Sequence, residues 1–502
     1  MLSPISNFAG SECGDDKLRI HVRIPSTIMR WFLLAASGIV GYQILLPPVV
    51  GLANQSDFKR VIGKFGYGPA APEALFSSIS LKYAPDPSYK VKEWEQPSTE
   101  DLFVQLALWI NELVSKDGKF DIRVMGLLHS AAFIATLAWL FRVTRDLPAR
   151  PLIWAGLILV TTDVGYVAYF NSFYAEPSSY LFCLLLLADS VDICRRGIAT
   201  ARLIRWSLWA TLFVMAKPIN APIGVLLGLF VLRLAWRSWA AWLGSAAILC
   251  GVFASAVTVP TEMTDANTYN LVFLALLRES SSPQADVVAL GFKPGSDVYA
   301  GTGAWSPNTG YDYLRRSGEI PKKVNLLTVD RFFLMHPTRL WRHIRANLSI
   351  ATLLRPSLGN FDSSLPNTRS KAFALWSGFH ETVLREVARL LFLLLLVPSI
   401  TLVCLWLRGR TSPMSFQFLA LQSSCCLVAF LAASFGDGWD TLKHMFLFNV
   451  LIDSCLFSAT AASWLAVTRT VKWALRQDHP FLQFQAVGGW VASQIGCRFP
   501  RR

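Results

Sequence analysis

The sequence predicts an all-α polytopic membrane protein with about ten transmembrane helices. Of its 502 residues, 53% are hydrophobic and only 16% are charged, and its mean hydropathy is +0.40. A soluble core could not bury so large a share of apolar side chains. A hydrocarbon core about 30 Å thick requires a helix of about 20 residues, and ten apolar segments of the sequence come near that length.

The predicted spans alternate with loops along the chain. They are 31–53, 122–143, 151–170, 178–194, 204–217, 219–235, 238–259, 388–407, 413–434 and 444–467. The fifth is short and is separated from the sixth by a tight turn at Lys217 and Pro218, so a total of nine or eleven stays open. The first 30 residues lack the order of a cleavable signal peptide, and we expect the first span to remain as an anchor.

Basic residues are distributed unequally between the two sides of the predicted membrane domain. They gather before the first span, between the second and third, between the fourth and fifth, and after the sixth and eighth. The opposite short loops hold Lys217 and Lys443 and little else that is basic. Because positive residues resist translocation, we expect the basic loops and both termini in the cytoplasm. The net charge of +14 then reflects topology and a basic cytoplasmic tail over 471–502, and we expect membrane lipids, not nucleic acid, as partners.

Two long segments, 54–121 and 260–386, then lie outside the cytoplasm as insertions in a single membrane domain over 1–470. In the first, PEALFSSISLKYA is expected to form a helix from Pro72, and Ser98 with Asp101 predicts the start of an amphipathic helix, EDLFVQLALWINELVSK. That second helix either lies on the bilayer surface or packs on the outer segment. In the other insertion, 329–354 alternates apolar and basic residues, which either meet phosphate groups or are solvated.

The stretch VTTDVGYVAYFNSFYAEPSSYLF, 160–182, carries acidic side chains at the outer end of the third span. Asp163 and Glu176 lie among aromatic residues with no Lys or Arg in the stretch. Ionisable groups at the edge of a span are costly and therefore indicate function. If the helix continues, Asp163 belongs to an aromatic stripe that faces an outer crevice. Alternatively, the carboxylates are solvated or cap the fourth helix, which Pro177 could begin.

Three further polar clusters fall at the outer edge of the membrane. Asp57 and Arg60 follow the first span, where a carboxylate could take a proton from a hydroxyl while cations attract a lipid phosphate. Lys217 is the only cation of its short outer loop. We expect that it either pairs with a phosphate or carboxylate or simply extends its side chain so that the ammonium reaches the membrane–water interface. The last outer loop carries a mixed set of charges just before the tenth span: Asp437, Asp440, Lys443 and His444.

Several familiar kinds of chemistry have no support in the sequence. No zinc-binding spacing, phosphate-binding loop, nucleophile elbow or dinucleotide fingerprint occurs in it. Most of the nine cysteines fall in or beside predicted spans, which indicates packing and not a disulfide framework. The residues by themselves therefore predict no cofactor.

In their order along the chain and their side of the membrane, the four clusters resemble the GT-C class of integral membrane glycosyltransferases, which use polyprenyl-phosphate-linked sugars. Within that class the chain is most similar to the bacterial glycan-biosynthesis hexose transferases of the WsfD type. The resemblance extends over most of 31–467. It rests on NQSDF, YFNSFYAEP, AKPINAP, KHMFLFN and the long outer segment TYNLVFLALLRESSSPQADVVALGF.

The resemblance implies roles for particular residues. Asp57 is similar to the first-loop catalytic carboxylate of the class. Substrate-binding positions follow from the same motifs and clusters: Arg60, Asn171, Tyr174, Glu176, Lys217, Asp437, Lys443 and His444. The chain departs from the acidic pair frequent in the class, because Gln55 and Ser56 precede Asp57 and no Asp-x-Asp is formed. A divalent metal ion, Mg²⁺ or Mn²⁺, is therefore left open as a cofactor.

The expected function is transfer of a sugar, a hexose by the resemblance, from a polyprenyl-phosphate donor to a glycan or lipid-linked acceptor. The expected place is the extracytoplasmic side of the bacterial inner membrane. Two alternatives stay open. A lipid-linked sugar flippase or other transporter would show paired halves with broken helices. A glycan ligase or polymerase would rely on basic residues of one large outer loop, for which the sequence offers Arg339, Arg342, His343 and His380.

Overall fold

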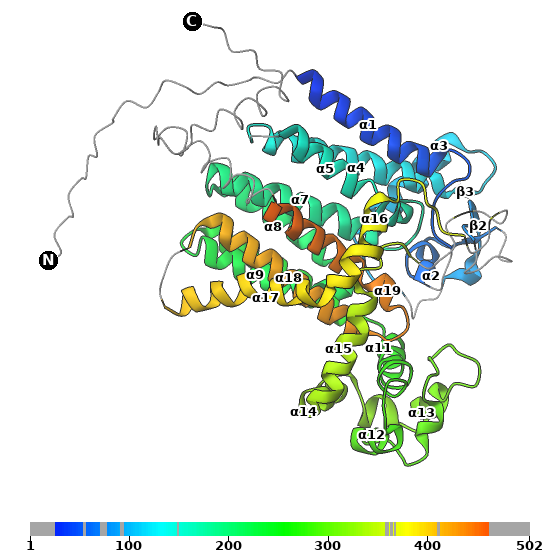
Figure 1. Cartoon of the computed structure of the whole chain (residues 1–502). Coiled ribbons are helices and arrows are strands. Elements are labelled where there is room, and N and C mark those ends of the chain that lie inside the picture. The colour runs from blue at the N-terminus through cyan, green and yellow to red at the C-terminus, as the bar shows by residue number, and fades with distance from the viewer. Residues whose placement is uncertain are drawn as a thin grey trace, which may run out of the picture.

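The computed structural model describes residues 26–460 apart from 54–56, 71–77, 91–94, 148–149, 357–360, 362–364, 366–367 and 409–411. The predicted tail over 471–502 lies outside the described residues. Long helices pack side by side as a bundle (Figure 1). They are α1 (Ser26–Leu45), α4 (Ile122–Thr144), α5 (Arg150–Thr161), α7 (Glu176–Arg196), α8 (Thr200–Val214), α9 (Ala221–Leu234), α10 (Trp239–Val257), α17 (Arg385–Leu407), α18 (Met414–Gly436) and the last described helix, 446–460.

The prediction of an all-α polytopic membrane protein is confirmed, with a smaller count of full-length spans. Among the described residues, seven helices are long and apolar enough to cross a membrane, or eight if a bent pair is taken as one span. The difference from ten comes from α8, with 15 residues, and from the apolar helix Pro218–Leu234. Both are shorter than the roughly 20 residues that a span needs.

Two predicted spans have different ends in the structure. The first helix ends at Leu45 and not at 53, because Pro47 and Pro48 cannot continue it. The third span is bent by 49° between α5 and the segment Val164–Phe170, which begins with α6 (Val164–Val167). Asp163 caps α6 by accepting a hydrogen bond from the backbone N–H of Gly165 (2.8 Å). The expected continuous stripe through Asp163 is therefore wrong.

The first insertion builds a small structure at one end of the bundle, which we call the loop end (Figure 1). It contains α2 (Asp57–Val61), α3 (Glu100–Val114) and an antiparallel sheet of β1 (Tyr67–Pro69), β2 (Lys82–Pro85) and β3 (Phe120–Asp121). Part of the helix expected from Pro72 lies outside the described residues, and its C-terminal part is wrong, since Lys82–Pro85 is a strand.

The amphipathic helix predicted after Ser98 is confirmed as α3. Its Ser98 hydroxyl accepts the N–H of Glu100 (3.1 Å), and Asp101 accepts the N–H of Ser98 (3.0 Å). Its apolar face is not covered by protein, since Trp109 is 57% and Leu113 64% exposed. This exposure favours the bilayer-surface interpretation over packing on the outer segment.

The second insertion forms a compact unit, residues 261–335, which we call the insertion domain. Its helices are α11 (Thr261–Tyr269), α12 (Pro283–Leu290), α13 (Tyr311–Arg316) and α14 (Leu326–Met335). Its buried side chains, such as Tyr269, Phe273 and Leu314, form a core separate from that of the bundle. After the insertion domain the chain continues through α15 (Pro337–Ala351) and α16 (Leu375–Phe379) to α17, and the short helix α19 (Thr441–His444) lies in the loop after α18.

Candidate functional site

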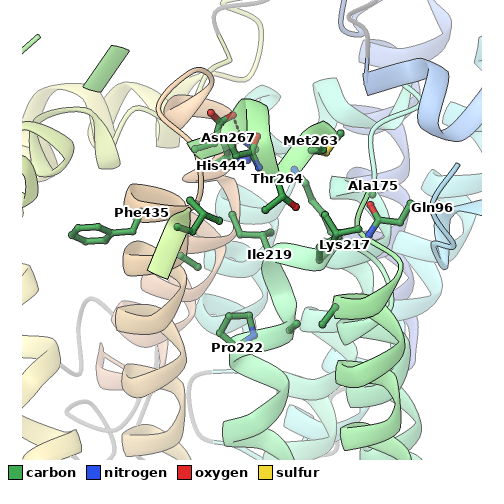
Figure 2. A pocket seen from close by; sticks show the side chains of 18 of the residues that line it. Gln96, Ala175, Lys217, Ile219, Pro222, Met263, Thr264, Asn267, Phe435 and His444 are labelled. Atoms are coloured by element: carbon green, nitrogen blue, oxygen red, sulfur yellow. Dashed lines mark ion pairs between the residues drawn. The ribbon is translucent and has the colours of Figure 1, made fainter. Parts of the chain in front are cut away.

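A cavity of about 870 Å³ lies where the bundle, the first insertion and the insertion domain meet. Figure 2 shows its wall, with Lys217 and Gln96 on one side, Phe435 on the other, and Pro222 below His444. Its polar and charged lining comes from widely separated parts of the chain: Asp57, Arg60, Gln96, Ser98, Glu176, Lys217, Thr264, Asn267, Asp330, Asp437 and His444.

Asp57 begins α2, and both of its carboxylate oxygens contact cations. Oδ1 lies 3.0 Å from the guanidinium of Arg60, one helical turn further on, and Oδ2 accepts a hydrogen bond from Nζ of Lys443. Burial alone would raise the pKa of the Asp57 carboxyl, but the charges of Arg60 and Lys443 outweigh it and hold the pKa well below its usual value. Asp57 is therefore ionised throughout the neutral range.

Glu176 and Lys217 form a second ion pair in the cavity wall. Glu176 is the first residue of α7, where Pro177 fits the first turn and the helix dipole favours a carboxylate. Lys217 Nζ lies 2.6 Å from Glu176 Oε1. The carboxylate partner expected for this lysine is thus present. Within the described structure, the buried Oε2 of Glu176 has no hydrogen-bond partner.

The last loop adds two adjacent basic residues from α19, Lys443 and His444. Lys443 bridges Asp57 and Asp440, with 2.9 Å between its Nζ and the Asp440 carboxylate, and is only 4% exposed. Its ammonium lies 5.0 Å from the ring centre of Tyr174. His444 faces the cavity, and its Nε2 lies 3.4 Å from the Asp437 carboxylate. The pairing of Lys443 with Asp57 joins the last loop to the first.

Asp163 and Asn171, both in the 160–182 stretch, do not line the cavity. Asn171 donates hydrogen bonds from Nδ2 to the carbonyls of Ile44 (2.9 Å) and Val50 (2.8 Å), which fixes the chain that leaves α1. Asp163 accepts the N–H groups of Trp376 and Ser377 as well as its cap bond. The expectation that Asp163 faces the crevice is wrong, because its oxygens bind backbone N–H groups inside the protein.

Sequence reasoning missed the contribution of the insertion domain to the cavity. Asn267 and Thr264 of α11 and Asp330 of α14 line it, as do Gln96 and Ser98 before α3. Apart from Ser98, which the sequence marks only as a helix start, none of these residues stands out in the sequence, because each belongs to an ordinary polar stretch. Docking of the insertion domain on the bundle brings Thr264, Asn267 and Asp330 to the ion pairs.

The remaining wall of the cavity is apolar and comes largely from helices of the bundle. Its side chains come mainly from α9, α10, α14, α15 and α18, with Val259 just after α10: Pro222, Ala256, Val259, Phe333, Leu334, Leu340, Ile344, Val428, Leu431, Ala432 and Phe435. The cavity therefore joins a charged end directly to an apolar wall, an arrangement suited to a ligand with a charged group and an aliphatic chain.

The described residues hold no group of three or more His, Cys, Asp or Glu side chains placed to bind a metal ion. The carboxylates of Asp57, Glu176 and Asp437 instead lie beside Arg60, Lys443, Lys217 and His444. The chemistry that this arrangement offers directly is the stabilisation of an anion by fixed cations.

Comparison with known sequences identifies a family. The family described as the YfdI N-terminal transmembrane domain matches residues 18–478. The chain belongs to this family. The match includes the bundle and both insertions, so the YfdI family domain contains the whole cavity. No curated protein sequence matches the chain.

Solved structures give only distant similarity to this YfdI family member. The archaeal oligosaccharyltransferase AglB from Archaeoglobus fulgidus, in complex with an inhibitory peptide and a dolichol-phosphate, shares 11% identity at a TM-score of 0.39, over 94% of this chain and 52% of that one. An Archaeoglobus fulgidus oligosaccharyltransferase tethered to an acceptor peptide shares 11% at 0.37, over 90% and 51%. The chain spans about half the length of each, and likeness at this level assigns no function.

Proposed function

We propose that this protein is a GT-C-type glycosyltransferase of the bacterial inner membrane. It transfers a sugar, a hexose, from a polyprenyl-phosphate donor to a glycan or lipid-linked acceptor on the extracytoplasmic side. The observation that carries the proposal is the cavity itself, in which clustered ion pairs adjoin an apolar wall of membrane helices. A polyprenyl-phosphate sugar has the same two parts, a charged phosphate and a long aliphatic chain.

The basic side chains of the cavity are the groups that bind the donor phosphate. Lys217 and Arg60 supply positive charge and His444 an imidazole donor; all three line the space, and each already lies beside a carboxylate. When the bond between the sugar and the phosphate breaks, negative charge grows on the leaving phosphate. Cations held in place before the reaction stabilise that charge without reorganisation, which lowers the barrier.

Asp57 is the proposed general base. The acceptor hydroxyl oxygen forms a bond to the anomeric carbon while the bond from that carbon to the phosphate oxygen breaks, with inversion. The hydroxyl proton passes to Asp57, and polyprenyl phosphate leaves. A carboxylate held by two cations is a weak base, but the donor phosphate offers Arg60, which lines the cavity, a second anion. Donor binding thus weakens the hold of Arg60 on Asp57 and raises the basicity of Asp57 at the moment it is needed.

The ligase or polymerase alternative has less support in the geometry. Arg339 lies 2.9 Å from Asp286 of the insertion domain, and His343 bonds to the carbonyl of Ser434. Arg342 donates to the carbonyl of Glu279, and His380 lies 2.7 Å from Asp453. Among the described residues that line the cavity, none of these four basic side chains appears.

The first test uses the full chain, reconstituted in liposomes with a synthetic polyprenyl-phosphate hexose and a glycan acceptor, and measures release of polyprenyl phosphate. The second compares the mass of surface glycans between cells that carry the wild-type gene and cells that carry a variant. Asp57→Asn should lower transfer by about 10²- to 10⁴-fold, the usual contribution of a general base. Asp117→Asn is the matched control, because Asp117 is an exposed carboxylate of the same insertion, 3.2 Å from Lys82.

Two results would decide against the proposal. Equal transfer by the Asp57→Asn and Asp117→Asn proteins would remove the proposed base. Accumulation of lipid-linked sugars on the inner leaflet of cells that lack the gene would favour the flippase.

A further inference from the structure

The insertion domain presents two polar side chains to the cavity that the fold leaves without a partner. Asp330 of α14 lines the cavity, and its carboxylate forms no hydrogen bond or ion pair with any residue that the structure describes. The side-chain amide of Asn267 on α11 also lines the cavity and likewise bonds to no described residue. Polar groups that converge on a cavity without partners of their own are available to a ligand.

Asp330 differs in this respect from the other carboxylates that line the cavity. Those three each lie beside a basic side chain, in the pairs Asp57–Arg60, Glu176–Lys217 and Asp437–His444. Burial raises the pKa of the Asp330 carboxyl, and no charge among the described residues lowers it again. The fold therefore holds this carboxylate at a cost in stability, which a ligand offsets when it donates a hydrogen bond.

Asp330 and Asn267 belong to two helices that each turn one face toward the cavity. On α14, the cavity-lining residues Leu326, Asp330 and Leu334 follow one another at intervals of one helical turn. On α11, Met263 and Asn267 line the cavity with the same spacing. The two helices pack against each other within the insertion domain. Their common wall thus carries a carboxylate and an amide among apolar side chains.

Asp330 lies on the side of the cavity away from Lys217. Phe333, one turn after Asp330, packs edge-on against Phe435 with 5.1 Å between the ring centres. Figure 2 shows Phe435 on one side of the cavity and Lys217 on the other. Because a carboxylate without a cation repels a phosphate, Asp330 also disfavours the donor phosphate on its own side. The charges of the cavity therefore separate a phosphate-binding side from a side that binds something else.

Inversion at the anomeric carbon determines what has to bind on that other side. The attacking hydroxyl approaches the anomeric carbon from the face opposite to the leaving phosphate. With the phosphate held by Lys217 and Arg60, the acceptor comes from the side of Asp330. A sugar hydroxyl donates to a carboxylate and accepts from an amide, and Asp330 and Asn267 offer these two groups.

We propose that Asp330 and Asn267 form the acceptor subsite of the cavity and that this subsite selects a saccharide without charge at the ring it holds. The inference rests on the proposed function and adds to it the residues and the charge selectivity of acceptor binding. Asp330 accepts hydrogen bonds from hydroxyls of the ring and repels a carboxylate or phosphate in the same place. Asn267 bonds to a further hydroxyl.

An ammonium group is the other ligand that a free carboxylate attracts. The amide of Asn267 favours the hydroxyl, because a hydroxyl engages both the donor and the acceptor of an amide, whereas an ammonium group engages only its oxygen. Binding of an amine instead of a neutral sugar is the competing outcome of the test.

The experiment measures binding of defined oligosaccharides to the full-length protein in lipid nanodiscs, without any donor, by saturation-transfer NMR. The neutral probes are hexasaccharides of β-glucan, α-mannan and β-galactan. The charged probes are the glucosamine and glucuronate counterparts of the β-glucan. The proteins are wild type, Asp330→Leu, Asp330→Asn, Asn267→Leu and the matched control Asp312→Leu. Asp312 is an exposed carboxylate of α13 in the same domain and is not among the described residues that line the cavity.

At least one neutral hexasaccharide should bind the wild-type protein and lose about tenfold or more in affinity in Asp330→Leu, the usual size of a hydrogen bond to a charged group. Asn267→Leu should lose less, and Asp312→Leu should match wild type. Asp330→Asn should keep part of the affinity and should bind the glucuronate probe better than wild type does. Asp330→Leu should unfold at the same or a higher temperature, because an uncompensated carboxylate is removed.

The inference is overturned by equal binding of the neutral probes to wild type and Asp330→Leu, or by no binding of any probe. Binding of the glucosamine probe alone would also overturn it and would assign Asp330 to an ammonium group. A lower unfolding temperature of Asp330→Leu would give the residue a structural role instead. Because no donor is present, failure here leaves the release of polyprenyl phosphate as a separate test, and absence of that release with saccharide binding intact would count against the proposed function alone.

Discussion

Asp57 and Asp163 both follow apolar helices, yet the structure gives them opposite surroundings. Asp57 lies in the wall of the cavity and contacts Arg60 and Lys443. Asp163 accepts the N–H groups of Gly165, Trp376 and Ser377 and is 1% exposed. Neutral donors of the backbone cannot move toward a ligand, whereas the side chains of Arg and Lys can. The comparison teaches that a carboxylate at the end of a membrane helix indicates a site only when it has a cavity and cationic partners.

Among the variants that test this comparison, breaking the ion pair between Lys217 and Glu176 in the cavity wall should cause the largest loss of transfer. Lys217→Met should lower transfer by about 10²- to 10³-fold, because one phosphate-stabilising cation is lost. It should also destabilise the protein by about 3 kcal/mol, since the Glu176 carboxylate is left buried without its partner.

The double variant Lys217→Met with Glu176→Gln separates the two effects. Stability, measured by thermal unfolding in detergent, should largely recover because no buried charge is left unpaired. Transfer should stay low because the cation is still missing. Recovery of both would show that the pair is structural, like the contacts of Asp163.

The Asp163 side of the comparison predicts the reverse pattern. Asp163→Ala removes three hydrogen bonds to a carboxylate and should lower the free energy of unfolding by about 3 kcal/mol. Transfer per folded molecule should change less than about threefold, since the residue does not line the cavity. A selective loss of transfer with unchanged melting would place Asp163 in the site after all.

The pH dependence of transfer sharpens the description of Asp57. Its folded pKa lies below the unfolded value of about 3.9, so the stability contributed by its ion pairs is present above that value and is lost as the pH falls further. In kcat/KM, which reports the free enzyme, no acidic limb from Asp57 should appear between about pH 5 and 8. Arg60→Gln removes one of the lowering charges and should move this limb to higher pH. An unchanged profile in Arg60→Gln would mean that Arg60 does not control Asp57.

The smallest expected effect concerns α3, none of whose residues lines the cavity. Trp109→Ser should weaken contact of this helix with the bilayer, measured as greater hydrogen exchange over 100–114, while transfer stays within about twofold of wild type. Asn111→Ser on the opposite, buried face is the contrasting variant, because its side chain bonds to Lys119 and Asp121. Equal exchange in wild type and Trp109→Ser would favour packing against protein.

Much of the fold and a smaller part of the site could be predicted from the sequence. Apolar segment lengths predict the positions of the bundle helices, and the Ser98 and Asp101 pair predicts α3, because both signals are local. The short pair α8 and Pro218–Leu234 was correctly seen as the irregular part of the count. The bend at Asp163 was missed. Besides its local bond to Gly165, Asp163 accepts the N–H groups of Trp376 and Ser377, more than 200 residues away, and no local pattern records those contacts.

The sequence by itself determined that this chain resides in a membrane and which charged residues fall near the ends of its helices, since hydropathy and charge act over a few neighbouring residues. Only the tertiary structure decided which of those charges meet. Lys443 reaches Asp57 across 386 positions of the chain, and Asn267 and Asp330 join the cavity through docking of the insertion domain. The physical reason is that ion pairs and cavities depend on the packing of distant elements, which no local pattern records.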